Sequence, residues 1–256
     1  MIIDTGPALL AAELGGAGLL AGSFLGLVSL RLPRGEGFAG GRSRCRGCDQ
    51  PLPAWRLIPV LSYIAARGRC AVCGAAIPIR YPAMEVACAA IGVCAALTQP
   101  SIAAALLTAL LGWQLLLIAV VDGERFWLPD ALTLPLLGTG ILAAAALDRL
   151  SLVESIVGAA VGFGGLWLVG RAYRRIRGRD GLGGGDPVLL AAGGAWTGWI
   201  GLPSVLLWAA LGGLSVVAAR LLTGSRVSGS DRLPFGVFLA LGVWLTWLLG
   251  PLGLPR

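Results

Sequence analysis

Eight apolar segments separated by polar stretches run along the chain of 256 residues. Each is close to the roughly 17 to 25 residues with which an α-helix crosses a bilayer, although the sixth and eighth segments are short. The segments cover residues 8–30, 83–99, 101–121, 131–147, 152–171, 187–200, 203–222 and 235–250. This pattern predicts an all-α polytopic membrane protein with about eight transmembrane helices.

One polar stretch is long enough to form a small domain outside the membrane. It divides the chain into a first transmembrane helix at 1–30, a cytoplasmic domain at 31–82 and a seven-helix membrane domain at 83–256. A polypeptide of about fifty residues rarely encloses a sufficient apolar core by itself. We therefore expect the domain at 31–82 to depend on an additional cross-link.

Four cysteines in this stretch form two knuckles, Cys45-x2-Cys48 and Cys70-x2-Cys73, with 21 residues between the pairs. The spacing matches a tetrahedral four-thiolate zinc site, in which the metal is structural and supplies folding energy. The alternative is a pair of disulfides, which belong to oxidising compartments. The arginine-rich surroundings favour the cytosol and hence zinc. Each knuckle contains a glycine that would help its turn to close: Gly47 and Gly74.

Composition and charge agree with a membrane protein. Of the residues, 57% are hydrophobic and only 13% are charged, too few to cover a soluble globule of this size. All 20 basic residues are arginine, and with the N-terminus outside only Arg149 and Arg256 lie on the outer side. The positive-inside rule thus explains the net charge of +7, and nucleic acid is not expected as a partner. The absence of histidine leaves acid–base work to Asp, Glu, Cys or Tyr.

Two aspartates lie at the expected cytoplasmic edge of the membrane. Asp122 closes the third apolar segment and Asp186 opens the sixth, directly after a run of glycines at 183–185. Two aspartates that share a site cannot both ionise easily. The charged one can take a proton from water while the neutral one donates to a substrate carbonyl, as in aspartic proteolysis.

Other roles are open for the acidic residues. Asp186 begins a helix and has helix capping as an alternative, whereas Asp122 ends one, where the dipole disfavours an anion and catalysis is favoured. We expect Asp130, which follows Pro129, to cap its helix. Glu85 either contributes to the site or is stabilised by the dipole at the start of the second apolar segment.

Six ordered motifs resemble the prepilin peptidases, polytopic aspartic peptidases also called type IV leader peptidases. They are Gly22–Pro33, the paired cysteine knuckles, Arg80–Glu85, Asp122 with Leu128–Pro135, Gly183–Asp186 with Leu189–Trp196, and Leu233–Gly236. The resemblance implies that Asp122 and Asp186 are the catalytic pair and that the four cysteines bind zinc.

It also implies a multi-pass protein of the bacterial inner membrane that cuts the basic leader from type IV prepilin-like or pseudopilin precursors at the cytoplasmic face. Many such enzymes then methylate the new N-terminus with S-adenosylmethionine, whose site no motif locates. Departures from the family pattern are Glu124 for a second aspartate, Val188 for a frequent lysine and Val237 for a frequent proline.

Two other classes of function fit the sequence less well. A transporter with a proton relay of intramembrane aspartates would carry polar residues near the middle of several helices, yet the acids lie at helix ends. A membrane scaffold with a zinc-binding interaction domain would leave the ordered motifs unexplained. A further hypothesis concerns the leader, because five of the 13 acidic residues lie in two loops beside the proposed pair and would attract basic groups. They are Asp122, Glu124, Asp130, Asp180 and Asp186.

Overall fold

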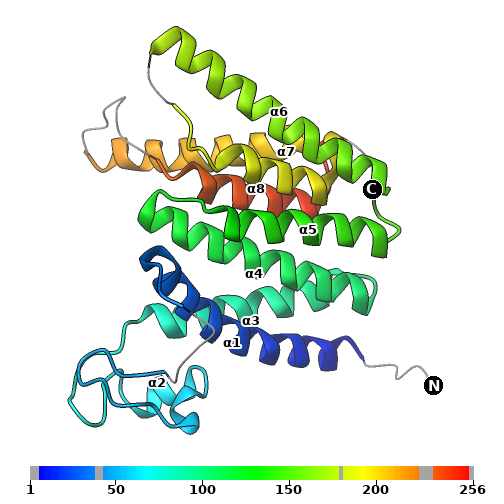
Figure 1. The fold of residues 1–256 in the computed structure, drawn as a ribbon. Helices are drawn as coiled ribbons and strands as arrows, with labels where there is room; N and C mark the ends of the chain where they lie inside the picture. The colour runs from blue at the N-terminus through cyan, green and yellow to red at the C-terminus, as the bar shows by residue number, and fades with distance from the viewer. Residues whose placement is uncertain (1–5, 38–42, 179–180, 225–232, 254–256) are drawn as a thin grey trace. The chain divides into compact units, whose positions relative to one another are not determined.

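The computed structural model describes residues 6–37, 43–178, 181–224 and 233–253, and their regular elements are all helical (Figure 1). The α-helices are α1 (Pro7–Arg31), α2 (Leu61–Ala65), α3 (Arg80–Thr98), α4 (Ile102–Arg125), α5 (Asp130–Ala146), α6 (Leu152–Arg177), α7 (Asp186–Leu222) and α8 (Phe235–Leu249). Two 3₁₀ turns, Leu32–Arg34 and Ala54–Leu57, complete the described elements. The chain forms two compact units, residues 1–113 and 114–256.

Five of the described helical stretches are long and apolar enough to cross a membrane. They are Pro7–Arg34, Arg80–Thr98, Ile102–Arg125, Leu152–Arg177 and Asp186–Leu222, and two shorter apolar helices are α5 and α8. The expected all-α chain with several apolar spans is therefore confirmed at this level.

The sixth and seventh predicted segments form one element, α7, which is interrupted at Gly198. This residue has φ 69° and ψ 172°, a conformation open mainly to glycine. Before the break Gly193 lies against Val243 of α8, and just after the break Gly201 lies against Thr246, closer to the end of α8. Further on, Gly212 lies against Phe238, close to the start of α8. The two parts of α7 therefore run in opposite directions along α8, and the change of direction lies at Gly198, close to the separation expected between the segments 187–200 and 203–222.

In the first unit, α1 and α3 pack with their backbones in close contact. A β-carbon on Gly22 would lie 2.5 Å from the Cα atom of Glu85, and one on Gly18 would collide with the carbonyl of Cys88. Small residues at such positions let two membrane helices approach closely. This packing explains why the motif that begins at Gly22 starts with a glycine.

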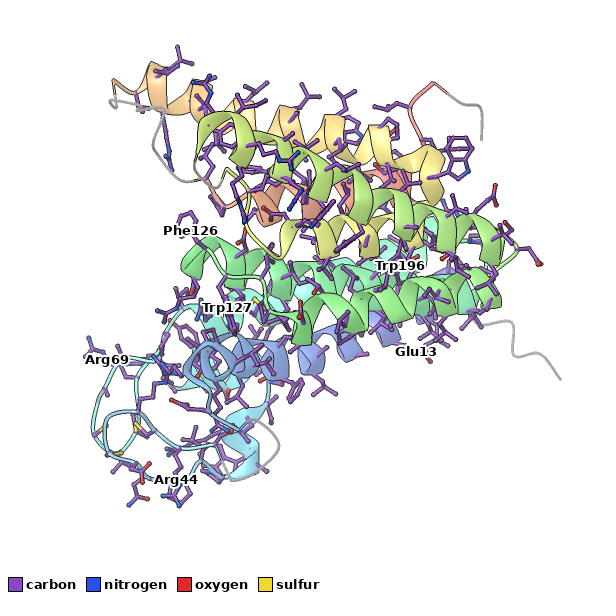
Figure 2. The ribbon with its side chains drawn as sticks, turned by 45° about the horizontal axis from the view of Figure 1, so that its top comes forward. Glu13, Arg44, Arg69, Phe126, Trp127 and Trp196 are labelled. Carbon is purple, nitrogen blue, oxygen red and sulfur yellow. The ribbon has the colours of Figure 1, made fainter. Side chains whose placement is uncertain are left out.

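In the second unit, glycines also set the helix contacts. Gly158 and Gly162 of α6 face the backbone of α7 at Gly194 and Leu190, so these two glycines let the helices approach closely. The core centres on Trp196, which is 1% exposed and is labelled in Figure 2.

The ring of Trp196 links three helices of this unit. Its indole N–H donates to the carbonyl of Leu136 in α5 at 3.0 Å, and its ring packs edge-on against Trp247 of α8. A buried tryptophan needs such a partner for its N–H group. These contacts hold α5, α7 and α8 together.

Candidate functional site

The four cysteines of the two knuckles form one cluster. Their sulfur atoms all lie within 4.8 Å of one another, and those of Cys45 and Cys73 are 3.7 Å apart. Four sulfurs placed tetrahedrally at 2.3 Å from zinc are about 3.8 Å apart, so the donor set fits this metal. Backbone N–H groups of Cys73 and Val72 lower the pKa of Cys70 to about 6, which favours the thiolate form that a metal requires.

The knuckles share one backbone design. The N–H groups of Cys45 and Cys70 donate to the carbonyls of Gln50 and Ala75, which closes each turn. The position four residues after the first cysteine is left-handed in both knuckles, with Asp49 at φ 54° and Gly74 at φ 72°. Gly74 therefore closes its turn as expected.

Gly47 has a different role from the one expected. The left-handed position of its knuckle belongs to Asp49, and a β-carbon on Gly47 would lie 2.8 Å from the Cβ atom of Ala75 and 3.2 Å from the sulfur of Cys73. The missing side chain makes room for the other knuckle. Gly47 thus allows the two cysteine pairs to meet.

Asp122 lies in the last turn of α4, and its carboxyl group contacts the beginning of α8. Its Oδ2 atom accepts a hydrogen bond from the backbone N–H of Val237 at 3.2 Å. A β-carbon on Gly236 would lie 2.8 Å from the same oxygen, so only glycine leaves room for the carboxyl group there. Asp122 is 5% exposed. Its carboxyl is therefore buried against a helix N-terminus, where free N–H groups stabilise negative charge.

Asp186 is the first residue of α7 and is 4% exposed. Gly185 holds the N-cap position and α7 has no side-chain cap, so the capping role considered for Asp186 is wrong. Its Oδ2 atom instead accepts the N–H of Gly183 at 2.8 Å, which folds the glycine loop back onto the carboxyl group. The glycine run thus allows the loop to approach the carboxyl group closely, since a β-carbon on Gly183 would lie 3.1 Å from Oδ2 of Asp186.

Leu128 packs between the residues next to the two aspartates. Its side chain lies against the backbone of Gly185, next to Asp186, and against Gly236, next to the carboxyl of Asp122. The second unit therefore brings both carboxyl groups into one buried site at one end of its helices.

A tight turn returns the chain from α4 to this site. The N–H of Phe126 donates to the carbonyl of Asp122 at 2.8 Å, and Phe126 has a left-handed φ of 51°. The exposed side chains of Phe126 and Trp127 stand out at the end of α4 (Figure 2). The turn allows Leu128 to pack only six residues after Asp122.

Asp130 and Glu124 are exposed and are not buried with Asp122 and Asp186. Asp130 is exposed and forms no side-chain cap, because Pro129 occupies the N-cap position of α5; the capping role expected for Asp130 is therefore wrong. Its carboxylate stays in the first turn, where the helix dipole favours it. Glu124 is exposed, and Asp180 lies outside the described residues.

Glu85 belongs to the first unit, whereas the aspartate pair belongs to the second. It is 5% exposed, and its Oε2 atom accepts the N–H of Val60 at 2.7 Å. Val60 has a left-handed φ of 59°, which is costly for a β-branched residue. Glu85 thus ties the polar segment to α3, a role that its position in the sequence does not reveal.

Comparison with known proteins decides the family. Residues 17–99 match the bacterial peptidase A24 N-terminal domain and residues 109–218 match the type IV leader peptidase family. A protein of Pseudomonas putida is 36% identical, with 91% of this chain and 88% of the relative covered. The chain belongs to the type IV leader peptidase family.

Two further relatives support this membership. A protein of Aeromonas hydrophila is 39% identical over 82% of this chain and 72% of its own length, and one of Burkholderia pseudomallei is 43% identical over 82% and 67%. All three relatives are named prepilin leader peptidase/N-methyltransferase. No solved structure matches the chain.

In this member of the leader peptidase family, the residues that surround the two aspartates were not predicted from the sequence. Gly236 belongs to the motif Leu233–Gly236, to which the sequence assigns no role. Val237 differs from the family pattern, in which proline is frequent at this position. The hydrogen bond from Val237 to Asp122 spans 115 positions, so no local pattern could have announced it.

Proposed function

We propose that this chain is a membrane aspartic endopeptidase that removes the basic leader from type IV prepilin-like precursors, with Asp122 and Asp186 as its catalytic pair. The observation that carries the proposal is the burial of both carboxyl groups in one site, each with a backbone N–H donor on one oxygen. Buried carboxylates that interact are costly and typical of functional sites.

In this mechanism one aspartate is ionised and its partner is protonated. The carboxylate takes a proton from a water molecule, whose oxygen attacks the scissile carbonyl carbon, while the protonated partner donates to the carbonyl oxygen. The aspartate that took the proton from water then gives it to the leaving amine nitrogen as the C–N bond breaks, and the other aspartate takes a proton back from the hydroxyl group as the new carboxyl group forms. The N–H groups of Val237 and Gly183 would hold one oxygen of each aspartate in place during these transfers.

The proposed membrane topology has eight crossings with the N-terminus outside, in the bacterial inner membrane. The reversal at Gly198 supports it, because the two parts of α7 would then cross in opposite directions. Asp122 and Asp186 would lie at the cytoplasmic edge, where a precursor presents its leader. The precursor's apolar helix would pack among the helices of the enzyme.

Two cofactors belong to the proposal. Zinc would be held by Cys45, Cys48, Cys70 and Cys73 in a structural site, since four thiolates leave no position for water. S-adenosylmethionine would supply a methyl group for the new N-terminal amine, in line with the names of the relatives. The transporter alternative is not favoured, because the relatives are peptidases.

The test is incubation of the purified protein with a pilin-like precursor, followed by mass measurement of the product's N-terminus. Asp122→Asn and Asp186→Asn should each abolish cleavage, because either change removes one member of a proton-sharing pair. Asp130→Asn is the matched control and should retain cleavage, since this side chain is exposed and makes no cap. Normal cleavage by either of the first two variants would remove the pair from the mechanism.

A further inference from the structure

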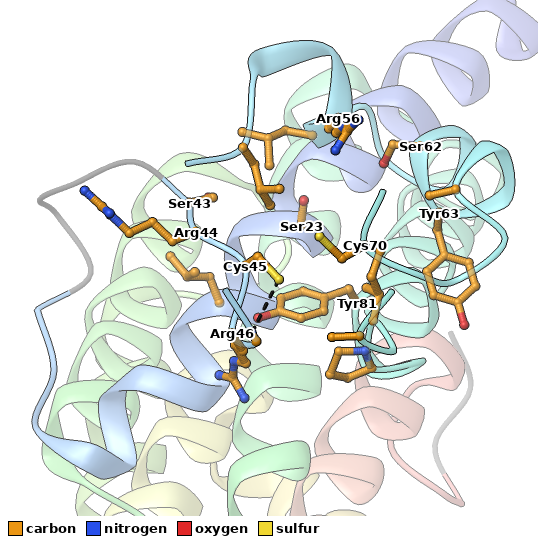
Figure 3. Close-up of a pocket in the computed structure, with 18 of the residues that line it drawn as sticks. Ser23, Ser43, Arg44, Cys45, Arg46, Arg56, Ser62, Tyr63, Cys70 and Tyr81 are labelled. Atoms are coloured by element: carbon orange, nitrogen blue, oxygen red, sulfur yellow. Dashed lines mark hydrogen bonds between the residues drawn. The ribbon is translucent and has the colours of Figure 1, made fainter. Parts of the chain in front are cut away.

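The polar segment between α1 and α3 exposes a cluster of large apolar side chains. They belong to residues 55–64, and their exposed fractions are 63% for Trp55, 41% for Leu57, 48% for Ile58, 66% for Leu61 and 64% for Ile64. In α2, Ser62 and Tyr63 instead line a cavity of the first unit (Figure 3). Leu61 and Ile64 therefore occupy the opposite face of this helix. An exposed apolar patch of this kind marks a surface that meets a protein or a membrane.

Residues 55–64 lie beside apolar parts of α1 and α3. The N–H of Val60 donates to Oε2 of Glu85 at 2.7 Å, and the backbone of Glu85 packs against Gly22 of α1. Glu85 lies 85 − 80 = 5 residues inside α3, or about 7.5 Å along a helix, and Gly22 lies 31 − 22 = 9 residues, or about 13 Å, before the end of α1. Both helices are long and apolar enough to cross a membrane. Because a helical side chain leans toward the N-terminus of its helix, Val60 lies near the surface of such a membrane and not beyond the helix ends.

Backbone N–H groups of this segment find acceptors inside the protein, as contact with lipid requires. The N–H groups of Ser62 and Ile64 donate to the carbonyls of Ile58 and Val60 at 3.1 and 3.0 Å. The N–H of Val60 precedes α2 and is accepted by the buried Glu85. A loop in water can leave such a donor to solvent, whereas at a lipid surface an unpaired N–H is costly. The buried carboxylate thus satisfies the one of these three donors that precedes the helix.

Arginines flank the exposed apolar side chains on both sides. The guanidinium carbon of Arg56 lies over the ring of Trp55, 4.7 Å from its centroid, and the exposed Arg67 follows α2. Tryptophan is typical of the boundary between acyl chains and water, and arginine pairs with the phosphates of anionic lipids. This order of groups, basic and aromatic around an apolar centre, is complementary to a lipid surface.

We propose that residues 55–64 are an interfacial membrane anchor. Leu61 and Ile64 enter the boundary of the acyl chains, and Arg56 and Arg67 contact phosphates of anionic lipids. The anchor requires the proposed crossing of a membrane by α1 and α3, but not the cleavage chemistry. It holds the cysteine segment against the bilayer, so that this segment does not move freely in the cytosol.

Photo-cross-linking tests the lipid contact. The full-length protein carries p-benzoylphenylalanine at position 64 and is placed in nanodiscs of phosphatidylethanolamine and phosphatidylglycerol. Irradiation should attach lipid to this position, as measured by mass spectrometry of the peptides. Val86 of α3, which is 53% exposed, gives the positive control, and Val72 of the second cysteine knuckle, which is 63% exposed, gives an apolar position outside the anchor. Lipid adducts at 64 should match those at 86 and exceed those at 72 by about fivefold or more.

A pair of substitutions tests the same contact without a cross-linker. Leu61→Ser combined with Ile64→Ser changes only exposed side chains, and unchanged elution from size exclusion in detergent is the check on folding. In nanodiscs, trypsin should cut after Arg67 about fivefold faster in this variant than in the wild type, because the bilayer no longer shields α2. Val72→Ser is the matched control and should be cut like the wild type. Replacement of phosphatidylglycerol by phosphatidylcholine should also speed the cut, since arginine is attracted less to a neutral surface.

Three results would overturn the anchor. They are lipid adducts at 86 without adducts at 64, cross-links from 64 to a second copy of the chain or to added precursor in place of lipid, and equal rates of cutting after Arg67 in the wild type and the double variant. Absence of lipid adducts at both 64 and 86 would refute the membrane crossing of α3 and the anchor together. A wild type that forms lipid adducts at 64 but does not cleave precursor would instead refute the proposed peptidase and support the anchor.

Discussion

Replacement of Gly236 by alanine places a methyl group where the carboxyl group of Asp122 now lies. The new carbon would be 2.8 Å from Oδ2 and 3.0 Å from Cγ of Asp122, whereas ordinary contacts begin at 3.4 Å. The carboxyl must therefore withdraw by 3.4 − 2.8 = 0.6 Å from this oxygen contact alone. Where Oδ2 moves directly away from the N–H of Val237, their hydrogen bond, now 3.2 Å long, lengthens to 3.2 + 0.6 = 3.8 Å and is lost.

The loss of this bond sets the size of the effect. A hydrogen bond to a charged group contributes about 1.5–3 kcal/mol, which corresponds to about tenfold to hundredfold in rate if the bond positions the reacting carboxyl. We expect kcat for precursor cleavage to fall by this factor with little change in KM, because the substrate-binding surface is not altered. Initial rates over a range of precursor concentrations measure both constants.

Two further variants isolate the cause. Gly138→Ala in α5 is the control, because a β-carbon there would meet no atom within 4 Å, and it should cleave like the wild type. The methyl group on residue 236 would also lie 2.7 Å from Leu128. If that contact were responsible, adding Leu128→Ala to Gly236→Ala would restore kcat, and we expect no such rescue. A wild-type kcat in Gly236→Ala alone would refute the role of α8 in holding Asp122.

Two other predictions concern zinc and the leader. Cys73→Ser should lose the bound metal, measured as one zinc per chain in the wild type, and should make the cysteine segment sensitive to protease while the apolar helices stay protected; a metal-free wild type would contradict the site. Joint neutralisation of Glu124 and Asp180 should raise KM for precursors with a basic leader, and the wild-type KM should rise with salt. Unchanged kinetics on precursors with and without leader lysines would show that the leader is recognised elsewhere.

Much of this architecture could be predicted because local patterns determine it. Long apolar runs predict α1, α3 and α4, and the spacing of the cysteines predicts their cluster. The sequence separates the segments 187–200 and 203–222, whereas the structure places the break a few residues earlier, at Gly198, because one left-handed glycine is enough to interrupt the helix. The N-cap roles of Asp186 and Asp130 were wrong because Gly185 and Pro129 hold those positions.

The aspartate site depends on contacts that no local pattern carries. Asp122 ends α4, where the dipole of its own helix disfavours an anion. The N-terminus of α8 offsets this cost, since Val237 donates directly to the carboxyl group. Asp186 begins α7, and the first part of α7 runs in the same direction as α8. Two helix N-termini thus converge on two buried carboxyl groups, and their positive ends would stabilise the one negative charge of the proposed proton-sharing pair.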